Sequence, residues 1–289
     1  MTQRPVLCSV LIHLPRRVVR MTIPFKEIVD YSMIIDDMLW SYSRLSSFDD
    51  CKYGWFLKYI KHAPKGEPHF FSTYGSFCHD VLEKYLSGEL TKDELVPYFL
   101  EHYDEKVEGR APSKKVEENF FNSSLAYLEE IDFPFKDIEA TEKKVRFEVG
   151  GHPFIGYIDV LAKENGGYHI VDHKSHGLRP RSGRKVQTEY DKELDQYLRQ
   201  QYLYAIPIYD ETGEYPQTIS FNCYRHGRFI TEQFDPERME KVRKWAADKI
   251  EEIRNEKDWE ANPEEFRCTF ICDCADSCPY KAEYKRRWK

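Results

Sequence analysis

The sequence predicts an α+β fold built on a single core, with an inserted helical layer and a cysteine cluster near the C-terminus. Two observations carry this prediction. Residues 21–131 space their apolar side chains as helices do, whereas residues 144–174 contain three short runs typical of strands. One long helix, a second pair of strand-like runs and a last helix then follow before the cysteine-rich tail. A run of helices, then a meander, then one helix and another hairpin is the order expected of an α+β fold.

Composition excludes several classes of protein. The chain has 289 residues, with 43 Lys and Arg against 50 Asp and Glu, which gives a formal net charge of −7. Aromatic residues make up 15% of the chain, which argues against disorder. No stretch approaches the roughly 18–20 apolar residues of a membrane span, so we expect no membrane partner. The acidic balance gives no global basic surface, and any nucleic-acid contact must come from local patches.

The first residues do not fit the main fold. Residues 1–20 contain an apolar run that ends at arginines rather than at a small-residue cleavage site, which makes a poor signal peptide. We expect this segment to be a disordered leader and residues 21–289 to form one domain. Its expected parts are a helical part over about 40–140, a catalytic sheet core over about 141–235, and a C-terminal helix with the cysteine tail over about 236–289.

The helical part is predicted from apolar spacing and capping residues. Residues 21–60 read as mixed helix, and Ser43 is a plausible N-cap within them. Apolar side chains predict a helix over 74–86 that ends at a glycine. Residues 91–131 continue as helices, interrupted by a stretch that contains Gly and Pro.

A hairpin in the middle of the chain brings charged residues together. Strands are predicted at 144–149, 154–162 and 168–174. A two-residue turn at Asn165-Gly166 would place Asp159 opposite Asp172, whereas a turn at Gly166-Gly167 would place Asp159 opposite Lys174. In both registers the three charged side chains share one face, because residues two apart in a strand point the same way.

The charges of this hairpin lie among apolar strand residues, where they are costly unless they are paired or bound to metal. One interpretation is that Lys174 neutralises an aspartate at the end of the sheet. The other is that Asp159 and Asp172 hold a divalent cation, because opposed Cβ atoms lie about 4.5–5.5 Å apart. Carboxylate oxygens with open positions suit Mg²⁺ or Mn²⁺ and phosphate substrates.

After the hairpin the sequence predicts a loop over 175–190, a helix over 192–206 that Pro207 ends, strands over 218–224 and 228–234, and a charged helix over 236–259. The loop has no acidic residue between positions 175 and 188. The loop over 175–190 is either a solvated loop or a DNA-binding patch that contacts phosphates. The basic residues of this loop are Arg179, Arg181, Arg184 and Lys185.

Four cysteines cluster in the tail. Cys268, Cys272, Cys274 and Cys278 lie within eleven residues, and Cys51 could supply a distant ligand. We expect a reducing cytoplasmic location, where clustered thiols indicate metal more often than disulfides. A 4Fe–4S cluster takes four cysteines, and a cysteine followed by proline recurs in such sites. Zinc also accepts four thiolates, and unliganded thiols are a third alternative.

The order of these motifs resembles the PD-(D/E)XK nucleases. The nearest resemblance is to the branch that contains the nuclease domains of RecB and AddB, the CRISPR-adaptation exonucleases and related phage exonucleases. This resemblance covers about residues 40–280 and implies a restriction-endonuclease-like core, with a mixed central sheet flanked by helices. The motifs are an opening helix over 41–51, a histidine motif over 75–83, Asp159, Asp172-His173-Lys174, Gln200 with Tyr204, and the tail cysteines.

The resemblance implies a role for each motif residue in metal-assisted phosphodiester hydrolysis, in which a cation activates water and neutralises the phosphate. Lys174 would orient the attacking water, and Gln200 and Tyr204 would hold the lysine or the DNA backbone. Glu142, just before the first predicted strand, is only a weak candidate for the site. The implied metal ligands are His79, Asp159, Asp172 and the backbone carbonyl of His173.

The resemblance also favours a 4Fe–4S cluster over zinc in the tail. The spacing from Cys268 to Cys272 is one residue longer than is usual in the family, which leaves Cys274 as an alternative to Cys272. The implied cluster ligands are Cys51, Cys268, Cys272 and Cys278.

The function predicted from these residues is that of a DNA exonuclease dependent on Mg²⁺ or Mn²⁺. It would act on single-stranded or duplex DNA ends in recombination, repair, phage DNA processing or CRISPR adaptation, with a recombination or CRISPR-adaptation protein as a possible partner. One alternative is a non-hydrolytic DNA-end-binding subunit with the same fold and cluster. Another is a zinc-binding interaction module.

Overall fold

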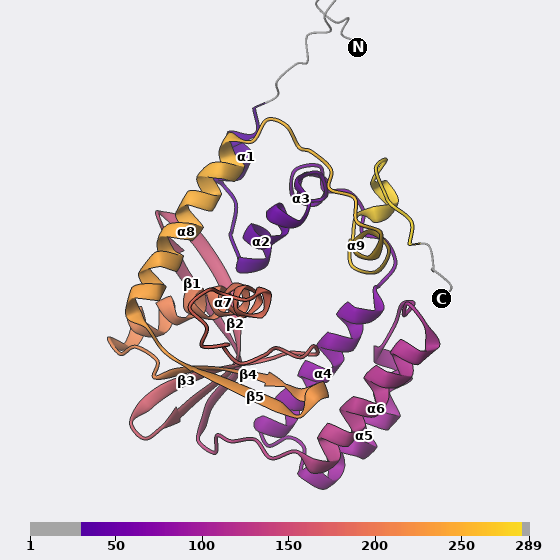
Figure 1. The fold of residues 1–289 in the computed structure, drawn as a ribbon, viewed down its shortest axis with the longest axis vertical. Helices are drawn as coiled ribbons and strands as arrows, with labels where there is room; N and C mark the ends of the chain where they lie inside the picture. The colour runs from indigo at the N-terminus through magenta and orange to yellow at the C-terminus, as the bar shows by residue number, and fades with distance from the viewer. Residues whose placement is uncertain (1–29, 285–289) are drawn as a thin grey trace, which may run out of the picture.

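The computed structural model describes residues 30–284 (Figure 1), so the leader predicted over 1–20 lies outside the described residues. The helical half of this region precedes the sheet. Its elements, in chain order, are helices α1 (Ser32–Asp36), α2 (Tyr42–Asp50), α3 (Lys52–Tyr59), α4 (Phe70–Leu86), α5 (Lys92–Lys106) and α6 (Lys114–Glu130), strands β1 (Ile138–Val149), β2 (His152–Glu164) and β3 (Gly167–His173), helix α7 (Glu189–Thr212), strands β4 (Thr218–Cys223) and β5 (Arg228–Gln233), and helices α8 (Pro236–Asn255) and α9 (Glu265–Phe270).

The sheet is mixed, with the order β1-β2-β3-β4-β5. Only the β3–β4 pair is parallel, and the other neighbouring pairs are antiparallel. The parallel pair requires a crossover connection, which α7 supplies between β3 and β4. The α+β fold with a mixed sheet flanked by helices is therefore confirmed.

The β2–β3 hairpin adopts the first of the two registers considered from the sequence. Glu164 pairs with Gly167, which leaves a two-residue turn at Asn165-Gly166. Both turn residues have positive φ, 51° and 77°, as the tight hairpin turn of this type requires. The same register carried one step beyond the last paired residues places Asp159 opposite Asp172.

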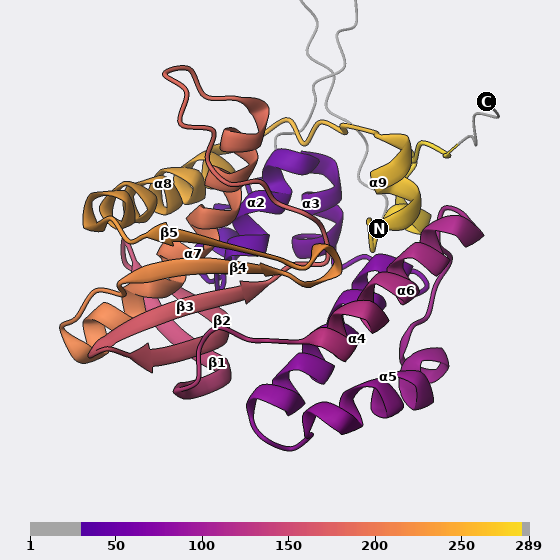
Figure 2. The same cartoon turned by 60° about the horizontal axis from the view of Figure 1, so that its bottom comes forward.

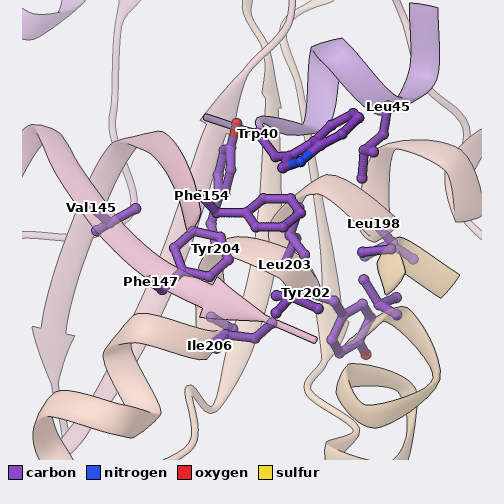
Figure 3. Close-up of a cluster of buried hydrophobic side chains, with 14 of the residues drawn as sticks. Trp40, Leu45, Val145, Phe147, Phe154, Leu198, Tyr202, Leu203, Tyr204 and Ile206 are labelled. Atoms are coloured by element: carbon purple, nitrogen blue, oxygen red, sulfur yellow. The ribbon is translucent and has the colours of Figure 1, made fainter. Parts of the chain in front are cut away.

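Helices cover the sheet in two layers. Helix α7 packs on β1, β2 and β3, and α8 packs on α7 and β1. A large buried cluster lies between these helices and the sheet, and Figure 3 shows Trp40, Phe154 and Tyr204 within it. Helices α4, α5 and α6 form a second layer at one end of the sheet, with a separate apolar core of their own (Figure 2). No helix among residues 30–284 is both long enough and apolar enough to span a membrane.

The predicted cap of the first long helix was wrong by two residues. Helix α2 begins at Tyr42, and the side chain of Ser41 accepts a hydrogen bond from the backbone N–H of Arg44 at 3.2 Å. Ser43, the predicted cap, lies inside the first turn. An N-cap has to lie outside the helix in extended conformation, which is how Ser41 is placed.

The prediction that Pro207 ends the long helix was also wrong. Helix α7 continues through Pro207 to Thr212 and ends at Gly213, whose φ of 74° is the left-handed conformation typical of a C-terminal glycine. A proline inside a helix removes one backbone hydrogen bond. The burial of Ile206, Pro207 and Ile208 in the core outweighs this loss.

We predict that Gly156→Ala destabilises the protein, because Gly156 lies against the ring of Tyr204. A Cβ atom at this position would lie 2.3 Å from Cε1 of Tyr204. Overpacking of this kind costs about 1–3 kcal/mol, which urea unfolding would measure as a loss in the free energy of unfolding. Gly75→Ala is the control, because a Cβ there meets nothing within 4 Å. An unfolding midpoint unchanged by Gly156→Ala would show that the Tyr204 ring moves aside freely.

Candidate functional site

Three acidic or imidazole side chains from three elements meet beside the end of β3. His79 comes from the middle of α4, Glu142 from β1 and Asp159 from β2. The Nδ1 atom of His79 lies 3.4 Å from Oδ2 of Asp159 and 3.7 Å from Oε1 of Glu142. One ligand atom from each of the three residues lies within 4.8 Å of the other two. This spacing is suited to a single metal ion.

The local conformation of β1 aims Glu142 at this point. Thr141 pairs with Val160 and Lys143 with Ile158, so Glu142 lies opposite Asp159. Glu142 has a φ of 45°, which is rare for a residue other than glycine. Such strained residues cluster at functional sites, where the surrounding structure holds them in place.

The peptide of His173 joins two of these side chains. Its N–H donates a hydrogen bond to Oδ2 of Asp159 at 2.8 Å, and its carbonyl oxygen accepts one from Nε2 of His79 at 3.1 Å. With Nε2 used as a donor, neutral His79 turns the lone pair of Nδ1 toward the carboxylates. The carbonyl of His173 thus contacts His79 at Nε2, the ring nitrogen that points away from the two carboxylates.

Asp172 and Lys174 form a buried pair next to this group. Nζ of Lys174 lies 2.6 Å from Oδ2 of Asp172 and 5.1 Å from the centre of the Tyr197 ring. The other carboxylate oxygen of Asp172 accepts a hydrogen bond from Nε2 of Gln201 at 2.6 Å. Both oxygens of Asp172 therefore have protein partners, and a cation shared by the two aspartates would replace Lys174 at Oδ2.

Electrostatics at the site favour a bound cation. Burial and the neighbouring charge of Asp172 raise the pKa of Asp159 to about 7. Burial lowers the pKa of His79, but the carboxylates of Glu142, Asp159 and Asp172 outweigh it, and the pKa is raised overall. The carboxylates of Glu142, Asp159 and Asp172 thus lie close together at a largely buried position. Carboxylate oxygens and an imidazole nitrogen are ligands that suit Mg²⁺ or Mn²⁺.

Helix α7 contributes a residue that the sequence prediction did not select. Gln200 and Tyr204 were predicted to act at the site, but the Gln200 amide donates a long hydrogen bond, 3.5 Å, to the Tyr204 hydroxyl. Gln201, one position along, contacts Asp172 instead. A signal was present, because Gln201 continues the apolar face of Leu194 and Leu198, where a polar side chain needs a buried partner.

The basic loop places its four cations in different surroundings. Arg181 is held by two carboxylates, with N···O distances of 2.8 Å to Asp195 and 3.0 Å to Glu232. The guanidinium of Arg179 lies 3.9 Å from the centre of the Tyr190 ring. Arg184 and Lys185 are exposed. The loop therefore has one arginine in a structural ion pair and two cations open to solvent.

The tail cysteines gather against the start of α3. A cavity of about 190 Å³ is lined by Cys51 and by all four tail cysteines. The Sγ atom of Cys51 accepts hydrogen bonds from the backbone N–H of Gly54 at 3.3 Å and of Asn262 at 3.4 Å. All seven cysteines of the described region are free thiols, namely Cys51, Cys78, Cys223, Cys268, Cys272, Cys274 and Cys278.

Comparison with known proteins identifies the family. A model of the PD-(D/E)XK nuclease superfamily matches residues 39–282. The chain belongs to the PD-(D/E)XK nuclease superfamily. These nucleases use divalent metals, and the group of His79, Glu142 and Asp159 gives this member a place to hold one.

The individual proteins that this PD-(D/E)XK chain resembles share little sequence identity with it. No curated protein sequence matches it. A crystal structure of an Eubacterium rectale protein, provisionally named an exonuclease, is 14% identical, with a TM-score of 0.46, and the match covers 93% of this chain and 97% of that one. The structure of SSO0001 is 16% identical, with a TM-score of 0.25, and the match covers 49% of this chain and 60% of that one.

The raised pKa of Asp159 predicts that metal binding depends on pH. A carboxyl group with a folded pKa of about 7 holds its proton more tightly than in the unfolded chain. Its contribution to stability is therefore present at low pH and falls as the pH rises toward 7. Mg²⁺ competes with that proton, so it should raise the melting temperature more at pH 8 than at pH 6.

A thermal-shift titration with Mg²⁺ at the two pH values measures this difference. Asp159→Asn should abolish the shift at both pH values, and Glu148→Gln, an exposed position on β1, should keep it. Equal shifts in the wild type at pH 6 and pH 8 would contradict the titration assigned to Asp159.

Proposed function

We propose that this chain is a Mg²⁺- or Mn²⁺-dependent deoxyribonuclease that hydrolyses phosphodiester bonds at DNA ends. The observation that carries the proposal is the convergence of His79, Glu142 and Asp159 beside the Asp172–Lys174 pair. A resident cation would neutralise the phosphate and lower the pKa of an attacking water. We infer that Nδ1 of His79, Glu142 and Asp159 hold this cation, with Asp172 joining when Lys174 moves off its oxygen. The His173 carbonyl would join only when it releases Nε2 of His79.

Lys174 and the residues around it complete the proposed catalytic site. The ammonium group of Lys174 can hydrogen-bond the attacking water and offset negative charge that develops on the phosphate. Its Nζ atom lies between the carboxylate of Asp172 and the face of the Tyr197 ring, which positions the ammonium group. Gln201 in turn fixes the carboxylate plane of Asp172. Gln200 and Tyr204 support the wall of the site at Gly156 in this proposal.

The exonuclease mode and the DNA end rest on the resemblance of the motif order to the RecB and AddB branch. We place the DNA backbone along the loop over 175–190, with Arg179, Arg184 and Lys185 as its phosphate contacts. Arg181 is better suited to shaping the loop, because both of its ion pairs are to protein carboxylates. The free thiols of the described region suit the reducing cytoplasm, where a recombination or CRISPR-adaptation protein would be the partner.

We also propose that the tail holds a 4Fe–4S cluster. Cys51 and the four tail cysteines line one cavity of about 190 Å³, which brings together enough thiols for the four ligands of such a cluster. The preference for iron–sulfur over zinc rests on the resemblance of the motif order. Burial and the nearby Cys274, Cys268 and Cys51 raise the pKa of the Cys272 thiol, which places it among the other proposed ligands.

Cys274 is the weaker choice for a ligand. Burial raises the pKa of its thiol, and its neighbours are Lys58, Asp273 and Cys278, without Cys51 or Cys268. Burial raises the pKa of Cys278 as well, and that thiol does have Cys51 and Cys268 as neighbours. We therefore propose Cys51, Cys268, Cys272 and Cys278 as the ligands, with Cys274 packed beside them.

The nuclease proposal predicts that Asp172→Asn, Lys174→Ala and Glu142→Gln each slow DNA cleavage by about a hundredfold or more. DNA binding in Ca²⁺ should change little, because these groups act chiefly on the transition state. Digestion of end-labelled single-stranded and duplex DNA in Mg²⁺ or Mn²⁺ measures the rates. Lys163→Ala, an exposed lysine on β2, is the matched control and should cleave as the wild type does.

Wild-type rates in a folded Asp172→Asn protein would overturn the assignment of the site. A wild-type protein that binds DNA ends but does not cleave them would instead support the non-hydrolytic end-binding alternative. Cleavage of covalently closed circles at the rate of linear DNA would overturn the exonuclease mode.

The cluster proposal predicts that Cys51→Ser removes bound iron and the visible absorbance near about 400 nm. It should also lower the free energy of unfolding by about 5 kcal/mol, because the cluster would close a loop of about 200 residues. Iron analysis, absorbance and urea unfolding measure these effects. Cys223→Ser, in β4, should keep the iron. Full iron content in Cys51→Ser and its loss in Cys274→Ser would show that Cys274 is the ligand instead.

A further inference from the structure

The position of His173 controls two of the proposed metal ligands at once. Its backbone N–H holds Asp159 and its carbonyl oxygen holds His79, as described above. A small rotation of this one peptide would move both side chains away from the third, Glu142. The placement of the metal centre therefore depends on what fixes residue 173.

The side chain of His173 is fixed from the opposite face of the sheet. Its imidazole is buried, and its Nδ1 atom lies 3.0 Å from Nδ2 of Asn222. Asn222 is the β4 residue paired with His173 in the parallel register, and it is also buried. The same Nδ2 atom donates a hydrogen bond to the hydroxyl oxygen of Tyr127 on α6 at 2.8 Å.

These contacts determine where the protons lie. An amide nitrogen carries two hydrogens and accepts none, so Asn222 donates one to Tyr127 and the other to His173. Nδ1 of His173 must therefore be the acceptor, and the proton of the neutral ring lies on Nε2. The Asn222 amide therefore donates one hydrogen bond to the His173 imidazole and one to the Tyr127 hydroxyl.

We propose that Tyr127, Asn222 and the His173 imidazole form a positioning chain that holds the His173 peptide, and through it His79 and Asp159, in the geometry that binds the metal. The inference rests on the proposed function, because it takes a cation to bind at His79, Glu142 and Asp159. In this proposal helix α6 helps to position the metal ligands, since Tyr127 connects the helical layer to the metal centre through Asn222 of β4. Groups that orient metal ligands in this way are worth about 10- to 100-fold in metal affinity or activity.

The surroundings of the chain allow it to be altered without filling a packed core. Tyr127 and Asn222 line a cavity of about 450 Å³ between α6 and the β4–β5 strands. A changed side chain at either position therefore has space beside it. A loss of metal affinity in such a variant would then report on orientation rather than on collapse of the fold.

The experiment replaces the donor of the chain by an apolar side chain of similar size. Asn222→Leu removes both N–H donors and supplies no acceptor, so neither tautomer of His173 can re-form the contact. Titration of the protein with Mn²⁺ alone should show a dissociation constant raised about tenfold or more. Asn222→Asp should keep more of the affinity than Asn222→Leu, because His173 protonated on Nδ1 can donate a hydrogen bond to the new carboxylate.

The matched control is Ser220→Ala, which changes a buried polar residue two positions earlier on the same face of β4. Ser220 contacts Thr231 at 2.9 Å, and neither residue belongs to the chain of Tyr127, Asn222 and His173. This variant should bind Mn²⁺ as the wild type does. Nitrogen-15 NMR of the wild type should show the Nε2-protonated tautomer of His173, which a purely space-filling role for Asn222 would not require.

Several outcomes would overturn the inference. They are unchanged Mn²⁺ affinity in folded Asn222→Leu, an affinity of Asn222→Asp no higher than that of Asn222→Leu, or an Nδ1-protonated His173 in the wild type. If Asn222→Leu does not fold, Tyr127→Phe replaces it and should weaken Mn²⁺ binding severalfold, and unchanged binding would again overturn the inference. Failure of the wild type to bind Mn²⁺ at all would overturn the proposed function itself, and this inference with it.

Discussion

The structure depends on the placement of two carboxylates opposite each other at the end of one hairpin. Asp159 and Asp172 lie among buried strand residues, where their mutual repulsion and their loss of hydration are both costly. Each partner found around them offsets part of this cost: Lys174 and Gln201 at Asp172, and the His173 N–H and His79 at Asp159. The elements that supply these partners are α4, β3 and α7, which are held by the packing of their apolar side chains. A divalent cation would complete the compensation.

The helical layer of α4, α5 and α6 contributes directly to the site around Asp159 and His173. It has a separate apolar core, yet α4 inserts His79 beside Asp159 and α6 brings Tyr127 to Asn222. Both contacts end on residue 173, one at its carbonyl and one at its ring. Because interiors are closely packed, a shift of this layer would be transmitted to the site through these hydrogen bonds. The layer thus determines the geometry of a site whose acidic residues belong to the sheet.

The two ends of the described chain are joined by a different set of contacts. Lys58 on α3 pairs with Asp273 in the tail at 2.6 Å, across 215 residues of sequence, and Lys52 pairs with Glu256. The ring of Tyr53 meets that of Tyr280 with centroids 5.0 Å apart. These contacts bring Cys51 and the tail cysteines together around one cavity.

The sequence by itself determined the local features, because they depend on neighbours in the chain. The Asn165-Gly166 turn specified the hairpin register, and the alternation of the strands placed Asp159, Asp172 and Lys174 on one face.

Tertiary structure decided the features that depend on long-range packing. It brought Glu142 to His79, because the start and register of β1 come from its pairing with β2. It selected Gln201 over Gln200, because only docking on the sheet decides which side of α7 faces Asp172. It carried α7 through Pro207, because burial outweighed the missing hydrogen bond. It also joined Asn222 to His173, since the parallel register of β3 and β4 is formed only when α7 has crossed between them.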